Sequence, residues 1–402
     1  MNFKDFGFDE RLLEGIDATG YETATAVQEQ VIPYILAGKD IIASAQTGTG
    51  KTAAFLLPII HKIISSSNGH DDHINALIIV PTRELAVQIA QNLEGLSYFT
   101  SISSIAVYGG GDGASFSQEK NALSRGADIV ICTPGRMIGH LAMGYVKLKH
   151  LQYLVLDEAD RMLDMGFNDD IMKIISFLPP KRQNLLFSAT MPGKIRELAR
   201  RILHNPEEVN ISISKPPEKI VQQAYVVFDA QKSALVKHLL RSKDFKSVLI
   251  FCSKKNNVKD LSRDLKRSGF SIEEIHSDLE QAMREQVLAA FINHRVRILV
   301  ATDILSRGID IDNIDLVINY DVPNDGEDYV HRIGRTARAE TDGTAYTLIN
   351  EKEQNKFAAI EELLGKPVTK TPVPEQFGET PAYQPRSGRS SNKRFPQKSR
   401  RN

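Results

Sequence analysis

Short apolar runs alternate with longer amphipathic stretches along most of this chain. In the first half, the runs DIIASA, ALIIV, SIAVY, DIVIC, YLVL and NLLFSAT are typical of strands, and RELAVQIAQNLEGL has the apolar spacing of a helix between two of them. Strands that alternate with helices in this way predict parallel sheets with crossover helices. The fold class that follows is α/β.

The alternation is interrupted once, at residues 204–220. Pro206, Pro216 and Pro217 lie in this stretch, which lacks helical periodicity and therefore indicates a linker. The alternation then resumes with QAYVVF, SVLIFC, RILVATD, DLVINY and AYTLIN. We therefore predict a first domain over residues 1–205, a short linker over 206–219 and a second domain over 220–365. Ligands of such sheets bind outside the carboxyl ends of the strands.

The composition limits the class of protein further. Of the 402 residues, 42% are hydrophobic and 25% are charged, as in ordinary globular domains. Fifty basic residues balance 50 acidic ones, so a nucleic-acid site has to come from local placement of charge. Cys132 and Cys252 form no CxxC pair, which argues against a zinc site or a disulfide framework and fits a reducing cytosol.

No targeting or membrane segment is expected. The N-terminus, MNFKDFGFDE, lacks the apolar core of a signal peptide, and no apolar run approaches the roughly 18 residues that span a bilayer. We therefore expect a cytoplasmic protein that does not enter a membrane.

Residues 366–402 differ in composition from both domains, because Pro, Ser, Gly and Arg dominate them. After Glu379 the segment has no acid, while seven basic residues follow: Arg386, Arg389, Lys393, Arg394, Lys398, Arg400 and Arg401. This composition predicts a disordered basic tail. Two interpretations remain open, a solubilising end and a segment that binds nucleic-acid phosphates through charge alone.

A phosphate-binding loop is predicted where AQTGTGKT follows the strand DIIASA and begins a helix. The spacing is that of a P-loop, with Ala45 in place of the usual first glycine. Its backbone amides and the helix N-terminus would face phosphate oxygens, and Lys51 would bring a charge to the β- and γ-phosphates of ATP. The predicted cradle consists of Gln46, Thr47, Gly48, Thr49, Gly50, Lys51 and Thr52.

Three acids follow the apolar run YLVL, at Asp157, Glu158 and Asp160. Carboxylates at the end of a buried strand require a cation, and Mg²⁺ beside a P-loop is the expected one. Asp157 and the Thr52 hydroxyl would hold this Mg²⁺, largely through water. Glu158 would orient the water that attacks the γ-phosphate, and Asp160 would receive hydrogen bonds from elsewhere in the domain.

With DEAD joined to AQTGTGKT, the chain resembles the DEAD-box ATP-dependent RNA helicases, and its short core is similar to the bacterial RhlE-like group. The resemblance extends from Phe3 to about residue 350 and includes further motifs in family order. They are PTREL (81–85), GG (109–110), TPGR (133–136), SAT (188–190), QAMR (281–284), ATD with SRGID (301–310) and HRIGRTAR (331–338). The resemblance implies two tandem RecA-like domains.

The resemblance also implies how ATP is read. Gln28 matches the glutamine whose amide reads the adenine edge, and Phe3 matches the aromatic residue that packs by the base, with Phe6 as a competitor. This chain has Ala24 and Ala26 where prolines are usual, which implies a looser loop before binding.

On the second domain, the resemblance assigns Asp310 to the ribose and Arg335 and Arg338 as arginine fingers for hydrolysis. A finger of this kind contributes about three to five orders of magnitude in rate. Ala337 replaces a usual glycine between them. His331 would sense domain closure, and Ser188 and Thr190 would couple Asp160 to the RNA site.

The remaining motif residues are expected to line an RNA groove. They are Thr82, Arg83, Gly110, Thr133, Gly135 and Arg136 on the first domain, and Gln281, Arg284, Thr302 and Gly308 on the second. Backbone and hydroxyl contacts of this type bind a strand without reading its bases, and contacts to 2′-hydroxyls favour RNA over DNA.

The expected activity is therefore RNA-stimulated ATP hydrolysis that separates short RNA duplexes. The alternatives are an ATP-dependent RNA clamp with little unwinding, and a DNA translocase of the wider helicase superfamily. Expected ligands are ATP, Mg²⁺ and RNA, and ribosome assembly and mRNA decay are both plausible settings for a monomer of this family.

Overall fold

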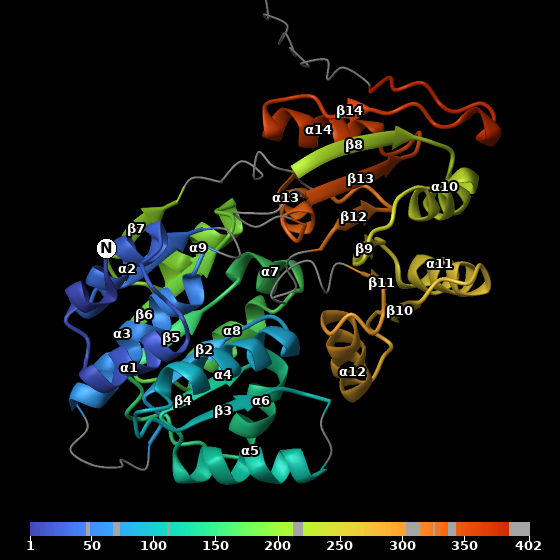
Figure 1. The fold of residues 1–402 in the computed structure, drawn as a ribbon. Helices are drawn as coiled ribbons and strands as arrows, with labels where there is room; N and C mark the ends of the chain where they lie inside the picture. The colour runs from blue at the N-terminus through green and yellow to red at the C-terminus, as the bar shows by residue number, and fades with distance from the viewer. Residues whose placement is uncertain are drawn as a thin grey trace, which may run out of the picture.

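A computed structural model describes residues 1–45, 49–66, 73–110, 113–211, 220–302, 314–324, 326–336 and 343–385. The chain forms two α/β domains, the first coloured blue to green and the second yellow to red (Figure 1). Among the described residues, each domain is built on a seven-stranded parallel sheet, and the two sheets have the same strand order. The predicted α/β class with two domains is confirmed.

The first sheet places the strand that precedes the predicted P-loop next to an edge. Its strands, in spatial order, are β3 (Ser104–Val107), β4 (Ile129–Cys132), β2 (Ala76–Ile79), β5 (Tyr153–Leu156), β6 (Gln183–Ser188), β1 (Ile41–Ser44) and β7 (Glu207–Asn210). Every residue of β2, β4, β5 and β6 is buried, because helices cover both faces of the sheet.

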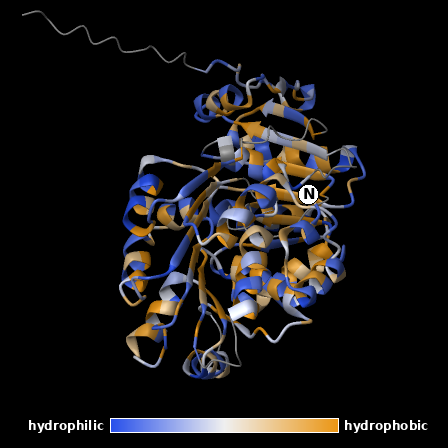
Figure 2. Cartoon of the chain, turned by 90° about the vertical axis from the view of Figure 1, so that its left-hand side faces the viewer, coloured by the Kyte–Doolittle hydropathy of each residue, from blue (hydrophilic) through white to orange (hydrophobic). Residues whose placement is uncertain are grey.

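Two layers of helices enclose this sheet. One face packs against η1 (Phe3–Phe6), α1 (Glu10–Ala18), α2 (Ala26–Leu36), α3 (Lys51–Ser66) and α4 (Arg83–Ser97). The other packs against α5 (Gly113–Arg125), α6 (Pro134–Ala142), α7 (Ala159–Asp164), α8 (Asn168–Ile175) and α9 (Gly193–Ile202). Figure 2 shows hydrophobic strands inside, between helices of mixed hydropathy.

The second sheet repeats the arrangement. Its strands, in spatial order, are β10 (Ile272–Ile275), β11 (Ile298–Ala301), β9 (Val248–Phe251), β12 (Leu316–Asn319), β13 (Gly343–Ile349), β8 (Ile220–Val226) and β14 (Thr369–Lys370). Its helices are α10 (Asp229–Ser242), α11 (Lys255–Arg267), α12 (Gln281–Ile292), α13 (Gly326–Ile333) and α14 (Gln354–Leu364), with a short η3 (Glu375–Phe377) after them.

The predicted linker begins too early. Residues 207–210 form β7, which pairs with β1 and belongs to the first sheet. Val209 is buried and Ile211 packs against the same core, so the alternating run EEVNISI carries a strand signal that the neighbouring prolines obscured. Residues 212–219, the remainder of the predicted linker, lie outside the described part of the chain.

The predicted tail also begins too early. Residues 366–385, which we call the strap, lie on the second domain, where β14 pairs with β8 and Val368 is buried. Tyr383 donates its hydroxyl to Glu361 Oε2 at 2.7 Å, and its ring receives the Lys370 ammonium 4.2 Å from the centroid. These residues are spaced too irregularly to show a periodic pattern. The basic residues from 386 onward lie outside the described residues.

Within the described residues, none of the helices has both the length and the apolar character needed to span a membrane.

The strap predicts different effects for two truncations. A chain that ends at residue 367 loses the strap, and burial of Val368 alone contributes about 1.5–3 kcal/mol to folding. A chain that ends at residue 385 keeps it. We expect urea unfolding of the second domain to shift to lower denaturant only in the shorter chain. Equal midpoints would contradict a structural role for the strap.

Candidate functional site

The predicted P-loop follows β1 and ends where α3 begins. Lys51 is the first residue of α3, is only 7% exposed, and donates from Nζ to the Ala45 carbonyl at 2.7 Å. The lysine therefore bridges the two ends of the loop. Thr52 follows it, half-buried, in the first turn of α3. Gln46, Thr47 and Gly48, predicted to contact phosphates, lie outside the described residues.

Gln28 is hydrogen-bonded to this loop. It lies in the first turn of α2, where its Oε1 accepts from the Thr25 amide at 2.8 Å and its Nε2 donates to the Gly50 carbonyl at 3.1 Å. Thr25 Oγ1 also donates to the Thr49 carbonyl at 2.8 Å. Gly50 has a φ of +89°, and a Cβ there would lie 2.5 Å from Gln28 Nε2, so the close approach requires glycine.

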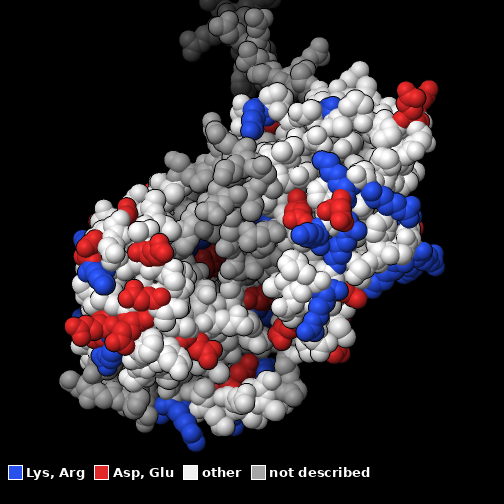
Figure 3. Space-filling view, viewed as in Figure 1, with Lys and Arg blue, Asp and Glu red and all other residues white. Residues whose placement is uncertain are grey.

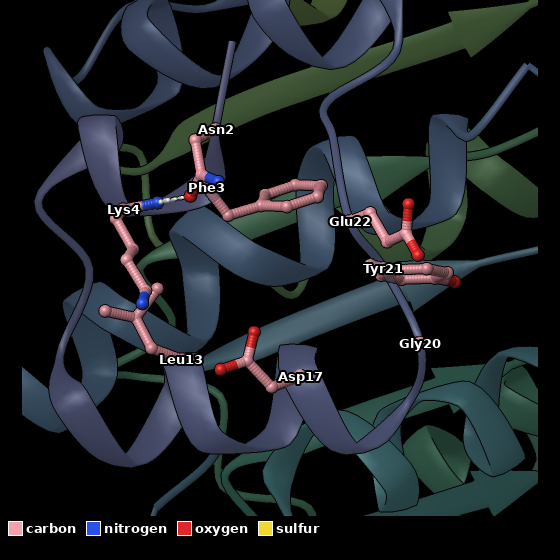
Figure 4. A pocket seen from close by; sticks show the side chains of 8 residues that line it. All are labelled: Asn2, Phe3, Lys4, Leu13, Asp17, Gly20, Tyr21 and Glu22. Atoms are coloured by element: carbon pink, nitrogen blue, oxygen red, sulfur yellow. Dashed lines mark hydrogen bonds between the residues drawn. The ribbon is translucent and has the colours of Figure 1, made fainter.

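Phe3 lies beside the same element. An isolated bridge joins Asn2 to Thr23, and the Phe3 ring is buried with its centroid 6.3 Å from that of Tyr21. Figure 4 shows Phe3 pointing across a pocket toward Tyr21. Phe6 is less buried than Phe3. Of the two candidates, Phe3 is the one that packs against the segment leading to Gln28.

Asp157 directly follows β5 and is almost completely buried. Its Oδ1 accepts a hydrogen bond from the Glu158 amide at 2.9 Å. Burial raises the pKa of Asp157 to about 6, although the positive charge of Lys51 opposes this rise. A cation placed against this carboxylate would therefore be strongly favoured.

Glu158 has an unusual backbone conformation. It precedes α7 with φ 51° and ψ 49°, in the left-handed region that non-glycine residues rarely adopt. Its Oε2 lies 3.5 Å from Arg161 Nη1. Strain of this kind is concentrated at functional sites, because the surrounding structure has to hold it in place.

Asp160 receives hydrogen bonds from the loop after β6, within the same domain. Its Oδ2 accepts from the amides of Ala189 and Thr190 at 3.2 and 3.0 Å. The Asp160 amide donates to Ser188 Oγ at 3.3 Å. The segment 188–190 and the acidic segment are thus joined directly, with the backbone of Thr190 as the donor.

The second domain contributes an arginine at the end of α13. Arg335 is buried, its amide donates to the Arg332 carbonyl at 3.3 Å, and its carbonyl accepts from the Ile314 amide at 3.1 Å. His331 lies in the last turn of the same helix and is buried as well. Arg338 and Asp310, predicted to act on ATP, lie outside the described residues.

Three helices begin at carboxyl ends of strands where the RNA motifs lie. α4 follows β2, α6 follows β4 and α12 follows β10. Thr82 caps α4 by accepting from the Leu85 amide at 3.3 Å, whereas Thr133, at the N-cap of α6, makes no capping bond with its side chain. A Cβ on Gly135 would meet no atom within 4 Å. Helix N-termini attract phosphates, so this edge is suited to a nucleic-acid backbone.

Arg83 lies against the two glycines of the GG motif. A Cβ on Gly110, whose φ is +94°, would come within 2.1 Å of Arg83 Nη1. On Gly109 the nearest atom would be Arg83 Nη2 at 3.5 Å, an ordinary contact. Gly110 is therefore the residue that allows the guanidinium of Arg83 to lie where it does.

Arg136, predicted to contact RNA, is paired within the domain. Its Nε donates to Glu119 Oε2 at 2.7 Å, and its guanidinium lies over the Phe116 ring, 4.8 Å from the centroid. The same Glu119 oxygen lies 2.8 Å from His140 Nε2. The charge of Arg136 is thus largely neutralised by Glu119, a residue that sequence reasoning missed.

Arg284, also predicted to contact RNA, instead crosses to the first domain. Its Nη1 donates to Glu84 Oε1 at 3.0 Å, and the two side chains are only 11% and 6% exposed. Its Nε donates a hydrogen bond to the Leu279 carbonyl, and its Nη2 donates one to the Ser277 carbonyl. Glu84 follows Arg83 in α4, so the ion pair joins the two predicted halves of the RNA groove.

Two further groove residues have buried polar atoms that find no hydrogen-bond partner among the residues the structure describes. These atoms are Gln281 Oε1 and Thr302 Oγ1, in the first turn of α12 and just after β11. Such atoms are costly unless a ligand or water satisfies them. Gly308 lies outside the described residues.

Fold and site together define a class of protein. The P-loop motif that ends at Lys51 and the acids that follow β5 lie at one edge of a parallel sheet, in the first of two RecA-like domains, which is the arrangement of a nucleoside triphosphatase.

Comparisons with known proteins agree with this class of protein. Residues 25–198 match the family model for DEAD/DEAH box helicases, and residues 231–340 match the model for the helicase conserved C-terminal domain. The ATP-dependent RNA helicase CshA of Listeria monocytogenes is 44% identical over 365 residues, which are 90% of this chain and 69% of that protein. The chain belongs to the DEAD-box RNA helicase family.

Two structures of a variant of Dbp5 from S. cerevisiae bear on domain arrangement. The one bound to RNA and ADP BeF3 is 30% identical, with a TM-score of 0.82 over 93% of this chain and 96% of that chain. The one bound to Nup159, Gle1, IP6 and ADP is 28% identical, with a TM-score of 0.64 over 92% and 96%. Because coverage and identity are nearly equal, the domain arrangement described here resembles the RNA-bound one more.

The close contact at Gly110 generates a prediction. In Gly110→Ala the new Cβ displaces Arg83, so we expect RNA affinity to fall by about tenfold, or ~1.4 kcal/mol, with ATP affinity unchanged. Gly109→Ala is the matched control, since its Cβ makes an ordinary contact. Fluorescence anisotropy with labelled single-stranded RNA measures both. Equal affinities of the two variants would show that Arg83 is not part of the RNA site.

Proposed function

We propose that the chain binds ATP and RNA together in the cleft between its domains and hydrolyses ATP only when the cleft is closed. The observation that best supports this proposal is that the site is divided between the domains. Lys51, Asp157 and Glu158 lie on the first domain, and Arg335 lies on the second. Closure bends one RNA strand so that a few base pairs separate, and hydrolysis reopens the cleft. Similarity to CshA and to RNA-bound Dbp5 supports this cycle.

In this proposal the first domain holds the nucleotide. Gln28 Nε2 has a second hydrogen besides the one given to Gly50, and this hydrogen donates to adenine. Phe3 packs by the base. Lys51 exchanges the Ala45 carbonyl for phosphate oxygens, and Thr49, Gly50 and the amides at the start of α3 bind the same phosphates.

Mg²⁺ fits the residues present. Asp157 is buried, its Oδ1 accepts from the Glu158 amide, and Thr52 carries a hydroxyl at the start of α3. One carboxylate and one hydroxyl, with substrate phosphates and waters, are the ligands that Mg²⁺ usually takes. Bound there, the ion would neutralise charge on the phosphates. Glu158 orients the attacking water, and Arg335, with Arg338, meets the charge that develops on the γ-phosphate.

RNA is proposed to bind along the edge formed by the first turns of α4, α6 and α12. Thr82, Arg83, Thr133 and Gly135 contact the backbone from the first domain, and Gln281, Thr302 and Gly308 do so from the second. None of these contacts reads a base, so binding is independent of sequence.

The surface charge differs between the domains. On the face of the molecule that Figure 3 shows, Asp and Glu are more frequent on the first domain, and Lys and Arg are more frequent over α10 and α11 of the second.

A second candidate is an ATP-dependent RNA clamp with the same ligands and little unwinding. The buried ion pair between Glu84 and Arg284 favours it, because a pair of this kind can specify one arrangement of the two domains. Displacement of a short labelled RNA duplex under single-turnover conditions separates the two: a helicase releases the strand, and a clamp retains it.

Several finer proposals accompany this function. We place the chain in the RhlE-like group because its short core followed by a basic tail is similar to that group. We propose a cytoplasmic monomer that acts in ribosome assembly or mRNA decay. The basic residues from Arg386 onward bind RNA phosphates by charge and tether the substrate near α14, where the strap ends.

The divided site predicts the effect of Arg335→Ala. Removing a finger from the second domain lowers the RNA-stimulated kcat by about three orders of magnitude or more, while ATP binding to the first domain persists. Steady-state hydrolysis at saturating RNA measures kcat, and titration with a fluorescent nucleotide measures nucleotide binding to the first domain. If RNA-stimulated hydrolysis stays at the parent rate, the divided-site proposal is wrong.

The ion pair between the domains predicts the effect of Glu84→Gln. Loss of the charge weakens closure, so we expect about tenfold more RNA for half-maximal hydrolysis, with little change in kcat at saturating RNA. Glu280→Gln is the matched control, an exposed acid at the N-cap of α12 that makes no capping bond. If Arg284 instead binds RNA directly, Glu84→Gln releases it and less RNA is needed.

A further inference from the structure

The two sheets allow position-by-position comparison, because their strand orders are the same. β8 occupies the place of β1, which leads to the P-loop, and β12 occupies the place of β5, which leads to Asp157. The crevice that holds nucleotide in the first domain therefore has a counterpart at the carboxyl ends of β8 and β12 in the second. The residues that fill this counterpart have no role in the proposed function so far.

The sequence after β8 resembles the end of the P-loop. Lys232, Ser233 and Ala234 follow β8 in the same order as Lys51, Thr52 and Ala53 follow β1. The segment between strand and lysine differs, because residues 227–231 contain no glycine and α10 has already begun at Asp229. Without glycines, this segment lacks the freedom to curl its amides around phosphates.

Carboxylates of the second domain surround the Lys232 ammonium. Its Nζ lies 3.1 Å from Glu353 Oε2, 3.4 Å from Asp321 Oδ1 and 3.3 Å from Asp229 Oδ1. Lys232 is only 1% exposed, and its ammonium lies over the Tyr320 ring, 5.5 Å from the centroid. Burial acts to lower the pKa of Lys232, but Glu353 and Asp321 outweigh it and raise the pKa above its ordinary value.

Asp321 connects this lysine to the neighbouring strands. It is the second residue after β12, the same offset at which Glu158 follows β5. Its Oδ2 accepts from the Ser253 amide at 2.8 Å and from Asn257 Nδ2 at 3.2 Å. Glu353 in turn accepts from the amides of Val322 and Asn350. The cluster therefore holds together the carboxyl ends of β9, β12 and β13.

From Asp321 the network continues to α13, which ends two residues before Arg335. The Asp321 carbonyl accepts from Arg332 Nη1 at 3.0 Å, and Asn319 Oδ1 accepts from the same nitrogen at 3.2 Å. Arg332 is completely buried in the last turn of α13, and its carbonyl receives the Arg335 amide. A shift of the end of β12 would therefore move Arg335.

We propose that Lys232 is a positioning residue for hydrolysis. It takes the place of a P-loop lysine in the second domain, where Asp321 and Glu353 supply the negative charge that phosphates supply in the first, and it thereby holds β12 and α13 so that Arg335 meets the γ-phosphate. The second domain accordingly binds no nucleotide of its own. The inference rests on the finger role proposed for Arg335.

The test is the steady-state kinetics of Lys232→Met at saturating RNA. Displacement of a catalytic group by about 1 Å can cost up to roughly a hundredfold in rate, so we expect kcat to fall about 10- to 100-fold. The KM for ATP should stay within about twofold of the parent value, since the P-loop is untouched. Because a loss of folded protein would also lower the apparent kcat without changing KM, the folded fraction of each variant is first measured by circular dichroism, and kcat is expressed per folded molecule.

Lys237→Met is the matched control. It lies on the same helix and loses an ion pair with Asp264, at 2.6 Å, that has no connection to β12. Its kcat should stay within about twofold of the parent. If Lys232→Met does not fold, Lys232→Met with Glu353→Gln removes one uncompensated buried charge and is assayed in its place, with the same expected loss of kcat.

The outcomes separate this inference from the proposed function. A folded Lys232 variant whose kcat equals the parent's, or a Lys237→Met variant that loses as much, overturns the positioning role. If Arg335→Ala still abolishes stimulated hydrolysis in that case, the divided site stands and only the role of Lys232 falls. If Arg335→Ala is also fully active, the finger proposal itself fails.

Discussion

Parallel pairing of the strands is the constraint on which the rest of this structure depends. In a parallel sheet every strand ends at the same edge, so residues that follow different strands are brought together although the chain separates them widely. In the first domain this edge gathers Lys51 after β1, Asp157 after β5 and Ser188 at the end of β6. The hydrogen bonds from the loop 188–190 to Asp160 are one consequence, and they connect the acidic residues to a neighbouring strand.

The same constraint explains why two domains are required. The carboxyl edge of the first sheet supplies a lysine, acids and helix N-termini, but the charge that develops during phosphoryl transfer also needs a cation. Arg335 is on the second domain, and the ion pair between Glu84 and Arg284 shows how the two edges are brought together. A buried pair has to offset the loss of hydration of both charges, so its contribution lies more in specifying one arrangement than in overall stability. In the proposed cycle, nucleotide binding, RNA binding and contact between the domains depend on one another.

Much of this could be predicted from the sequence, because the signals are local. Runs such as ALIIV and YLVL identified strands, and the spacing of AQTGTGKT identified the loop before Lys51. What escaped prediction depends on pairing between distant residues. Glu84 and Arg284 are 200 positions apart, and Glu119 neutralises Arg136 from another helix. The sequence predicts a linker and a tail where β7 and the strap lie, because prolines near short apolar segments hide a strand whose partner is far along the chain. The cluster around Lys232 likewise joins residues from the ends of three strands, which no local pattern indicates.

The central claim is that RNA completes an ATPase divided between two domains. Its most direct test is the rate of ATP hydrolysis by the full chain without nucleic acid, with single-stranded RNA, and with DNA of the same sequence. The account predicts slow hydrolysis alone, strong stimulation by RNA and little by DNA, because 2′-hydroxyl contacts distinguish the two. Fast hydrolysis without nucleic acid would contradict the claim, since the domains would then close unaided. Equal stimulation by DNA would contradict the RNA groove and indicate a translocase of the wider helicase superfamily.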